Sequence, residues 1–342
     1  MTAQLRLEGP VQSRGRTLWT WGRPLGGAAI LAVLVWRLGT GPFLDAVGRI
    51  DGWSLALAAG IALVTTVCCA WRWTLVARGL GVGVPLGRAV AAYYRSQFLN
   101  TTLPGGVLGD VHRGVRHGRD VGDVSRGLRA VVWERSAGQV VQTVLAVIVL
   151  LVLPSPVRSF MPVIAVAAAT CVLGAVVLSR AVSPDGSSMW ARCVRTAAAD
   201  LRDGLLARRA WPRILIASAL AVAGHVAIFM IAARTAGSTA SPLRILPLAL
   251  LVLLAMGLPT NIAGWGAREG VAAWAFGMAG LGAAEGVATA VVYGVMVLVA
   301  SLPGAGVLVA GWLHRQTPVP VRAGPAASWP VATTSTGGRA RG

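Results

Sequence analysis

Two stretches of the chain place an arginine at the same distance from a Leu-Pro pair. In each, four residues separate the proline from a glycine, and three more separate that glycine from the arginine. The matching residues are Leu103, Pro104, Gly109 and Arg113 in the first stretch and Leu258, Pro259, Gly264 and Arg268 in the second. A planar guanidinium binds phosphate through paired hydrogen bonds, and backbone N–H groups at a helix start add donors. The spacing predicts two half-sites for a phosphate-bearing headgroup, with the prolines as hinges.

Polar neighbours extend both half-sites. Asn100 and Asp110 flank the first glycine, and Glu269 follows the second arginine. Broken segments in corresponding places of two halves are typical of a transporter's binding site. Two alternatives remain open from the sequence: the likeness arises by chance in a Gly-rich chain, or Arg113 faces the cytoplasm like its basic neighbour Arg116.

A polar stripe interrupts the apolar run that begins near residue 130. Three of its members fall at i, i+4 and i+7 of a helix and so share one face: Arg135, Gln139 and Gln142. Such a stripe looks into the helix bundle, where it lines a hydrophilic path or bonds one helix to another. We expect Glu134 to pair with Arg113, or Asp110 to pair with Arg135, and the sequence does not choose between them.

No motif for a nucleotide, a metal or a covalent catalytic intermediate is visible in the sequence. The four cysteines lack metal-ligand spacing. We therefore expect no cofactor, no metal and no catalytic residue. His225 lies in the middle of an apolar run, where it is either a proton carrier or a histidine bonded to a neighbouring helix.

The composition is that of a polytopic membrane protein. Of 342 residues, 55% are hydrophobic and 13% charged, and the net charge is +19. Soluble domains carry about 25% charged residues. The arginines cluster between apolar runs, which indicates cytoplasmic loops and anionic lipid headgroups, and not nucleic acid, as their partners.

The order of apolar runs predicts an all-α helix bundle. About 20 residues cross the hydrocarbon layer, so about six to eight spans fit between residues 24 and 314 as a single transmembrane domain. The runs are 25–36, 53–70, 130–153, 163–178, 214–233, 245–258 with 271–281, and 287–312. Tails at 1–23 and 315–342 are predicted to be disordered, and the basic segment 180–213 to be a cytoplasmic loop or a helix on the lipid surface.

The run 89–103 is short and has basic segments on both sides. A re-entrant segment that enters and leaves from the cytoplasm satisfies both flanks. Three spans separate Pro104 from Pro259, so the two broken segments should enter from opposite faces. This predicts an inverted repeat with halves at about 52–153 and 213–312, and a cell-membrane protein with both termini in the cytoplasm.

The order of short motifs resembles the lysylphosphatidylglycerol synthase transmembrane-region family, also called flippase-like domain proteins. The likeness covers most of residues 25–314. It rests on these residues: Trp71, Trp73, Leu80, Gly81, Tyr94, Phe98, Asn100, Leu103, Pro104, Gly109, Asp110, Arg113, Glu134, Arg135, Leu258, Pro259, Gly264, Gly266, Arg268 and Glu269. Leu108 stands where the family pattern has a glycine.

The resemblance implies a multi-pass bacterial or archaeal membrane domain. Some members carry a cytosolic aminoacyl-lipid synthase, and there the membrane domain is credited with moving the product lipid across the bilayer. We expect this chain to represent the flippase-like part without the synthase domain.

Three functions remain open from the sequence. The first is translocation of a lipid whose phosphate is held by Arg113 and Arg268. The second is an accessory or catalytic role in glycolipid and cell-envelope synthesis, beside an enzyme partner, with Asp110, His112 and Glu134 acting on a lipid phosphate. The third is transport of a small solute or ion.

Overall fold

The computed structural model describes residues 30, 32–103, 106–160, 170, 189–257 and 266–316. These residues form helices and short turns, and no strand occurs among them. The predicted all-α class is therefore confirmed. The segments 1–23 and 317–342, and all of the run 163–178 except Thr170, lie outside the described residues.

Among the described residues, four helical segments are long and apolar enough to cross a membrane. At about 1.5 Å per residue, 20 residues cover a hydrocarbon layer of about 30 Å. The segments are α3 (Gly52–Gly79), α6 (Val124–Val152), α9 (Trp211–Thr235), and Ala283–Leu313, which joins α12 (Ala283–Ser301) to most of α13 (Pro303–Gln316). Asp51 and Asp123 cap α3 and α6 by accepting hydrogen bonds from the backbone N–H groups of Ser54 and Arg126.

All four segments are longer than the apolar runs that predicted them, and α3 and α6 extend the furthest at one end. α3 continues nine residues beyond Ala70, and α6 starts six residues before Ala130. In α3 the physical reason is that the added turns bury charge inside the bundle, since Arg72 forms an ion pair there with Glu134 of α6. The added turns of α6 carry Arg129, which pairs with Asp200. The end of an apolar run therefore underestimates the length of a helix when the next turn carries a charged residue that has a buried partner.

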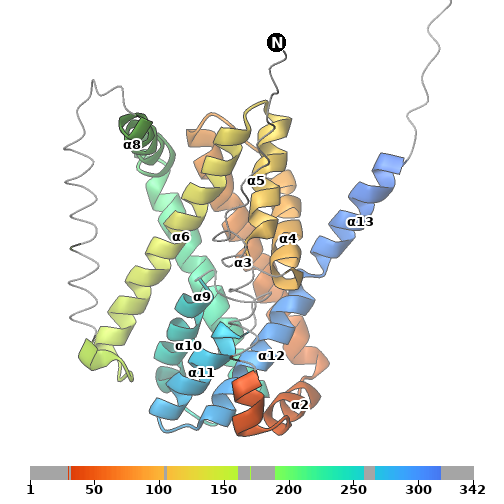
Figure 1. The fold of residues 1–342 in the computed structure, drawn as a ribbon, viewed down its shortest axis with the longest axis vertical. Helices are drawn as coiled ribbons and strands as arrows, with labels where there is room; N and C mark the ends of the chain where they lie inside the picture. Colours follow the sequence, from red (N-terminus) through yellow and green to blue (C-terminus); the bar gives the residue numbers. More distant parts are fainter. Residues whose placement is uncertain are drawn as a thin grey trace, which may run out of the picture.

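Two pairs of shorter helices complete the bundle. The first pair is α4 (Leu86–Thr102) with α5 (Leu108–Asp120), and the second is α10 (Pro242–Met256) with α11 (Ala267–Met278). Figure 1 shows the first pair in the upper half of the molecule and the second pair at the opposite end. The predicted hinge Pro104, together with Pro259 and Gly264, lies outside the described residues.

Glycines let α5 and α6 cross closely. A Cβ on Gly127 would lie 2.6 Å from the Cα of Gly118, and one on Gly114 would lie 3.2 Å from the Cα of Leu128. Small residues at a crossing allow the backbones of two membrane helices to approach. This crossing fixes the part of α6 that carries Glu134 against the start of α5.

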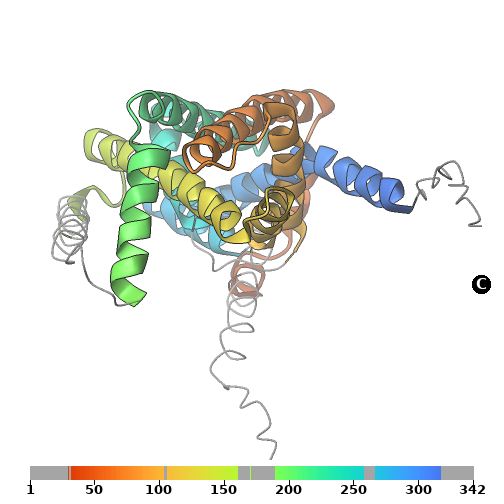
Figure 2. The ribbon, with the colours of Figure 1, turned by 90° about the horizontal axis from the view of Figure 1, so that it is seen from above.

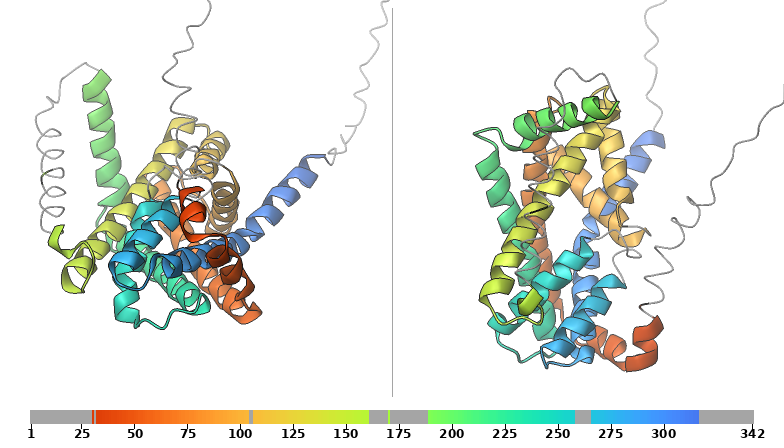
Figure 3. Two further views of the ribbon diagram at one scale, coloured as in Figure 1. Left: turned by 60° about the horizontal axis from the view of Figure 1, so that its bottom comes forward. Right: turned by 60° about the vertical axis from the view of Figure 1, so that its left-hand side comes forward.

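A short helix, α8 (Met189–Asp200), lies across the upper end of the bundle (Figure 2, Figure 3). Its last residue accepts hydrogen bonds from Arg129 Nε at 2.8 Å and from Trp133 Nε1 at 3.1 Å, both on α6. Asp200 therefore joins the segment predicted as a basic loop to the helix that carries Glu134 and Arg135. A further helix, α2 (Gly41–Gly48), packs against α12 at the lower end.

Candidate functional site

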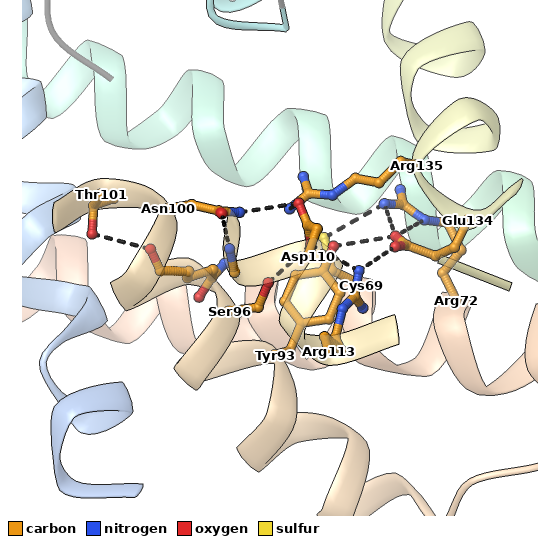
Figure 4. A network of polar contacts seen from close by, with 12 residues as sticks. Cys69, Arg72, Tyr93, Ser96, Asn100, Thr101, Asp110, Arg113, Glu134 and Arg135 are labelled. Carbon is orange, nitrogen blue, oxygen red and sulfur yellow. Dashed lines mark hydrogen bonds and ion pairs between the residues drawn. The ribbon is translucent and has the colours of Figure 1, made fainter. Parts of the chain in front are cut away.

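A buried ion-pair network joins α3, α5 and α6 (Figure 4). Glu134 of α6 is fully buried and lies between two arginines. Arg72 Nε donates to its Oε1 at 3.0 Å, Arg72 Nη2 donates to the same oxygen, and Arg113 Nη2 donates to Oε2 at 2.9 Å. Tyr93 of α4 adds a hydrogen bond from its hydroxyl to Oε1 at 3.1 Å. The carboxylate is thereby held by three helices.

Asp110, near the start of α5, is the second carboxylate of the network. Arg113 Nη2 donates to its Oδ1 at 3.0 Å, and Arg135 Nη2 contacts its Oδ2 at 2.6 Å. Ser96 Oγ donates to Oδ1 at 2.9 Å, and Asn100 Nδ2 donates to Oδ2 at 3.0 Å. The two pairings that the sequence offered as alternatives, Glu134 with Arg113 and Asp110 with Arg135, therefore both occur.

Asn100 fastens the end of α4 to the start of α5. Its Oδ1 accepts a hydrogen bond from the backbone N–H of Gly109 at 2.8 Å, while its Nδ2 binds Asp110. The fit is tight, because a Cβ on Gly109 would lie 2.8 Å from the Ser96 carbonyl carbon and 2.9 Å from Asn100 Oδ1. Gly109 thus has a packing role between the two helices.

Replacing Gly109 with alanine should lower the stability of the protein. The added methyl group must displace the Ser96 backbone or Asn100, and overpacking of this kind costs about 1–3 kcal/mol in the free energy of unfolding. Thermal unfolding in detergent, followed by tryptophan fluorescence, measures the loss. Gly306→Ala in α13 is the matched control, since nothing lies within 4 Å of a Cβ there. Equal unfolding temperatures for the two variants would contradict the close approach of α4 and α5.

The network carries an excess of positive charge. Its cations are Arg72, Arg113 and Arg135, and its carboxylates are Asp110 and Glu134, so three charges against two leave one positive charge over. An uncompensated charge at membrane depth is costly and marks a functional site. The arrangement is therefore suited to an anionic ligand.

The side chain of Arg113 is not accessible to a ligand. Its side chain is fully buried, and its guanidinium lies 4.6 Å from the ring centroid of Trp73 and 4.2 Å from that of Tyr93. These aromatic rings stabilise the cation in addition to the carboxylates. Arg135 differs, because 45% of its side-chain surface is accessible although it lies within the bundle. That accessible surface faces a cavity.

The cavity has a volume of about 650 Å³ and lies where the first helix pair and the end of α10 meet the long helices. Its walls come from α3, α4, α5, α6, α9 and α12, and from the end of α10 at Met256 and Gly257. Among the sequence-predicted residues, those that line it are Asn100, Asp110, Arg135, Gln139 and Gln142. Glu134, Arg113 and Gly109 lie behind that wall and support it. Small-molecule sites have volumes of about 300–1,000 Å³, so the cavity can hold a lipid headgroup.

Arg268 and Glu269 form a separate pair at the start of α11. Arg268 Nη2 donates to Glu269 Oε1 at 2.6 Å, and Glu269 Oε2 accepts the backbone N–H of Gly266 at 2.6 Å. The guanidinium is packed over Gly294 of α12, where a Cβ would lie 2.6 Å from its Cζ. Neither residue is among those that line the cavity. Their proposed contact with phosphate stays a prediction.

His225 of α9 lines the same cavity, and its Nδ1 lies 3.2 Å from the hydroxyl of Tyr293. This is the helix-to-helix hydrogen bond offered as one of its two roles. The contact ties α9 to α12 beside the site.

Sequence reasoning missed Arg72 as a site residue. The Trp-Arg-Trp order around it is typical of an interface anchor, yet its side chain is 6% exposed and lines the cavity. Ser218 of α9 accepts a hydrogen bond from Arg72 Nη1 at 3.1 Å. A usable signal existed: Thr65, Cys69 and Arg72 fall at i, i+4 and i+7, the spacing that identified the stripe on α6.

Comparison with known proteins supports the resemblance seen in the motifs. No curated protein matches the chain. The family model described as "Lysylphosphatidylglycerol synthase TM region" matches residues 24–304, which include the whole charge network and every residue of the cavity wall. The chain therefore belongs to the lysylphosphatidylglycerol synthase transmembrane-region family.

Proposed function

We propose that the protein moves a phosphate-containing lipid across the cell membrane, and that Arg135 and Arg72 bind the headgroup phosphate in the cavity. The observation that carries the proposal is the excess positive charge at the wall of a cavity inside a membrane helix bundle. A phosphate supplies the missing negative charge and accepts paired hydrogen bonds from a guanidinium. Membership of the family agrees with a function connected with membrane lipids.

Arg135 is the cation that can change partner at the lowest cost. When it leaves Asp110, that carboxylate keeps its hydrogen bonds from Ser96, Asn100 and Arg113. A phosphate can then take the place of the carboxylate on Arg135. Arg72 stays bound to Glu134 and presents its edge to the same cavity.

The placement of the helix pairs supports access from both sides of the membrane. The order of a long helix, a short pair and a long helix occurs twice, as α3 to α6 and as α9 to α12. The pairs lie at opposite ends of the bundle, and residues of α4, α5 and α10 reach the same cavity (Figure 1). We interpret the pairs as re-entrant segments of an inverted repeat, with the α8 end in the cytoplasm, whose halves rock about the bound headgroup.

The enzyme alternative has less support from the geometry. A general base needs an accessible lone pair. Asp110 and Glu134 each accept four hydrogen bonds or ion-pair contacts, and Glu134 is fully buried. Both carboxylates are better suited to holding arginines than to proton transfer.

Blocking the cavity should stop lipid movement. Ala300 of α12 lines the cavity, so Ala300→Trp places an indole in the space that the headgroup needs. Proteoliposomes with an acyl-labelled fluorescent phosphatidylglycerol report movement between leaflets through quenching from outside. Val144→Trp is the matched control, because Val144 is 52% exposed on α6 and does not line the cavity. Wild type and Val144→Trp should move the lipid and Ala300→Trp should not. Equal movement with all three proteins would contradict a path through this cavity.

A further inference from the structure

The cavity wall also indicates which headgroups can be carried. Its charged lining residues are two cations, Arg72 and Arg135, and one carboxylate, Asp110. A headgroup that carries a free amine needs a carboxylate or an open aromatic face for its ammonium. The availability of these two kinds of partner therefore decides whether an amine can be held.

No carboxylate of the cavity wall is free among the described residues. Oδ1 of Asp110 has two donors, Ser96 and Arg113, and Oδ2 has two, Asn100 and Arg135. A carboxylate has about four acceptor positions, so all of them are in use. When a phosphate draws Arg135 away, three donors remain, one of which is a buried arginine. An incoming ammonium would meet that cation.

The aromatic faces of the cavity are also occupied. Tyr93 has the guanidinium of Arg113 at 4.2 Å and that of Arg135 at 5.8 Å from its ring centroid. Tyr293 has Arg268 at 5.9 Å. Among the described residues, both tyrosines of the cavity wall therefore already lie near cations. They are also almost wholly buried, with Tyr93 2% and Tyr293 1% exposed, so little ring surface is left for an ammonium.

The rest of the polar wall consists of neutral groups. Gln139 and Gln142 make no hydrogen bond with another described residue, and Ser136 lies between Arg135 and Gln139 on the same helix. An amide offers two donors and an acceptor, which is the pattern that binds neutral hydroxyl groups. These amides follow Arg135 at i+4 and i+7, so they continue along the cavity beyond the proposed phosphate position.

We propose that the carried headgroup is a phosphate ester of a neutral polyol or sugar, and that amine-bearing headgroups are rejected. This inference rests on the proposed lipid movement and adds the class of substrate. The phosphate binds Arg135 and Arg72, and the hydroxyl groups of the polyol bind Gln139 and Gln142. An aminoacylated headgroup brings a cation beside two arginines with no partner for it, so selectivity comes from repulsion as well as attraction.

The test compares acyl-labelled lipids that differ only in headgroup. Phosphatidylglycerol and phosphatidylinositol should move at least about tenfold faster than lysylphosphatidylglycerol, a ratio equivalent to ~1.4 kcal/mol. Gln142→Glu gives an ammonium a carboxylate partner and should speed lysylphosphatidylglycerol. Gln142→Met, of similar length without charge, removes an amide that binds hydroxyl groups, so it should slow phosphatidylglycerol and leave lysylphosphatidylglycerol slow. An arm with entrapped glycerol phosphate separates a lipid substrate from a soluble one, since its retention in the vesicle supports the lipid.

The outcomes distinguish the two proposals. Faster or equal movement of lysylphosphatidylglycerol in the wild type would overturn the headgroup inference and leave lipid movement intact. Unchanged movement of phosphatidylglycerol in Gln142→Met would overturn the role of the amide. An unchanged rate for lysylphosphatidylglycerol in Gln142→Glu would overturn the missing carboxylate as the cause of rejection. Release of glycerol phosphate at the lipid's rate would overturn the lipid as substrate. Absence of movement for every lipid would overturn the proposed function itself, and the inference with it.

Discussion

Replacing Arg135 with glutamine is expected to remove lipid movement while leaving the fold intact. The variant loses the accessible cation of the cavity and one or more hydrogen bonds to a charged phosphate. Such bonds contribute about 1.5–3 kcal/mol each, so the rate should fall about 10- to 100-fold. Stability should change little, because Asp110 keeps Ser96, Asn100 and Arg113 as donors. Transbilayer movement and thermal unfolding, measured on the same preparation, separate the two effects.

Arg126→Gln is the matched control for this variant. Arg126 is an arginine of the same helix with 51% of its side chain exposed, paired with Asp123 and not among the residues that line the cavity. It should move lipid at the wild-type rate. Arg135→Lys should recover part of the rate, since a lysine keeps the charge but binds phosphate as a point charge without the planar fork. Full activity in Arg135→Gln would contradict a phosphate contact at this residue.

Replacing Glu134 with alanine should have the largest effect on stability. The change leaves Arg72 and Arg113 without their shared carboxylate at a position that is fully buried. Breaking a buried ion pair by removing one partner costs about 3–5 kcal/mol in the free energy of unfolding. Unfolding by heat or denaturant in detergent micelles, with tryptophan fluorescence as the signal, measures this loss.

A double variant shows whether the loss arises from the unpaired arginine. Arg72→Met with Glu134→Leu removes both charges of one pair and fills the space with apolar side chains. It should be more stable than Glu134→Ala, because only one arginine then lacks the carboxylate. If Glu134→Ala unfolds at the wild-type temperature, the network does not hold α3, α5 and α6 together.

The helical architecture could be predicted from the sequence because apolar length is a direct consequence of membrane thickness. The broken stretch at Pro104 was recognisable for a related reason, since polar backbone at membrane depth needs cover from other helices. The ends of the helices were harder to predict. α3 passes through Arg72 without ending, and only knowledge of its partner Glu134, 62 residues away, makes such a buried charge acceptable.

The site could be predicted in its parts but not in its pairing. Asp110, Glu134 and Arg135 were identified from residue type and spacing. The sequence offered two alternative ion pairs, and both form in one network because Arg113 binds both carboxylates. Which arginine faces the cavity depends on helix rotation. The sequence assigned the phosphate to Arg113 and Arg268. The rings of Trp73 and Tyr93 lie against Arg113, whereas Arg135 is the accessible cation of the network. Spacing identifies a face of a helix, and only packing decides what that face meets.

The most direct test of the claim that Arg135 binds a lipid phosphate is a structure of the protein in a bilayer that contains phosphatidylglycerol. We expect a lipid phosphate in the cavity, with an oxygen about 2.7–2.9 Å from an Arg135 nitrogen. The contact between Arg135 and Asp110 should then be open, while Asp110 keeps Ser96, Asn100 and Arg113. A cavity that holds only water or acyl chains, with Arg135 still bound to Asp110, would contradict the claim.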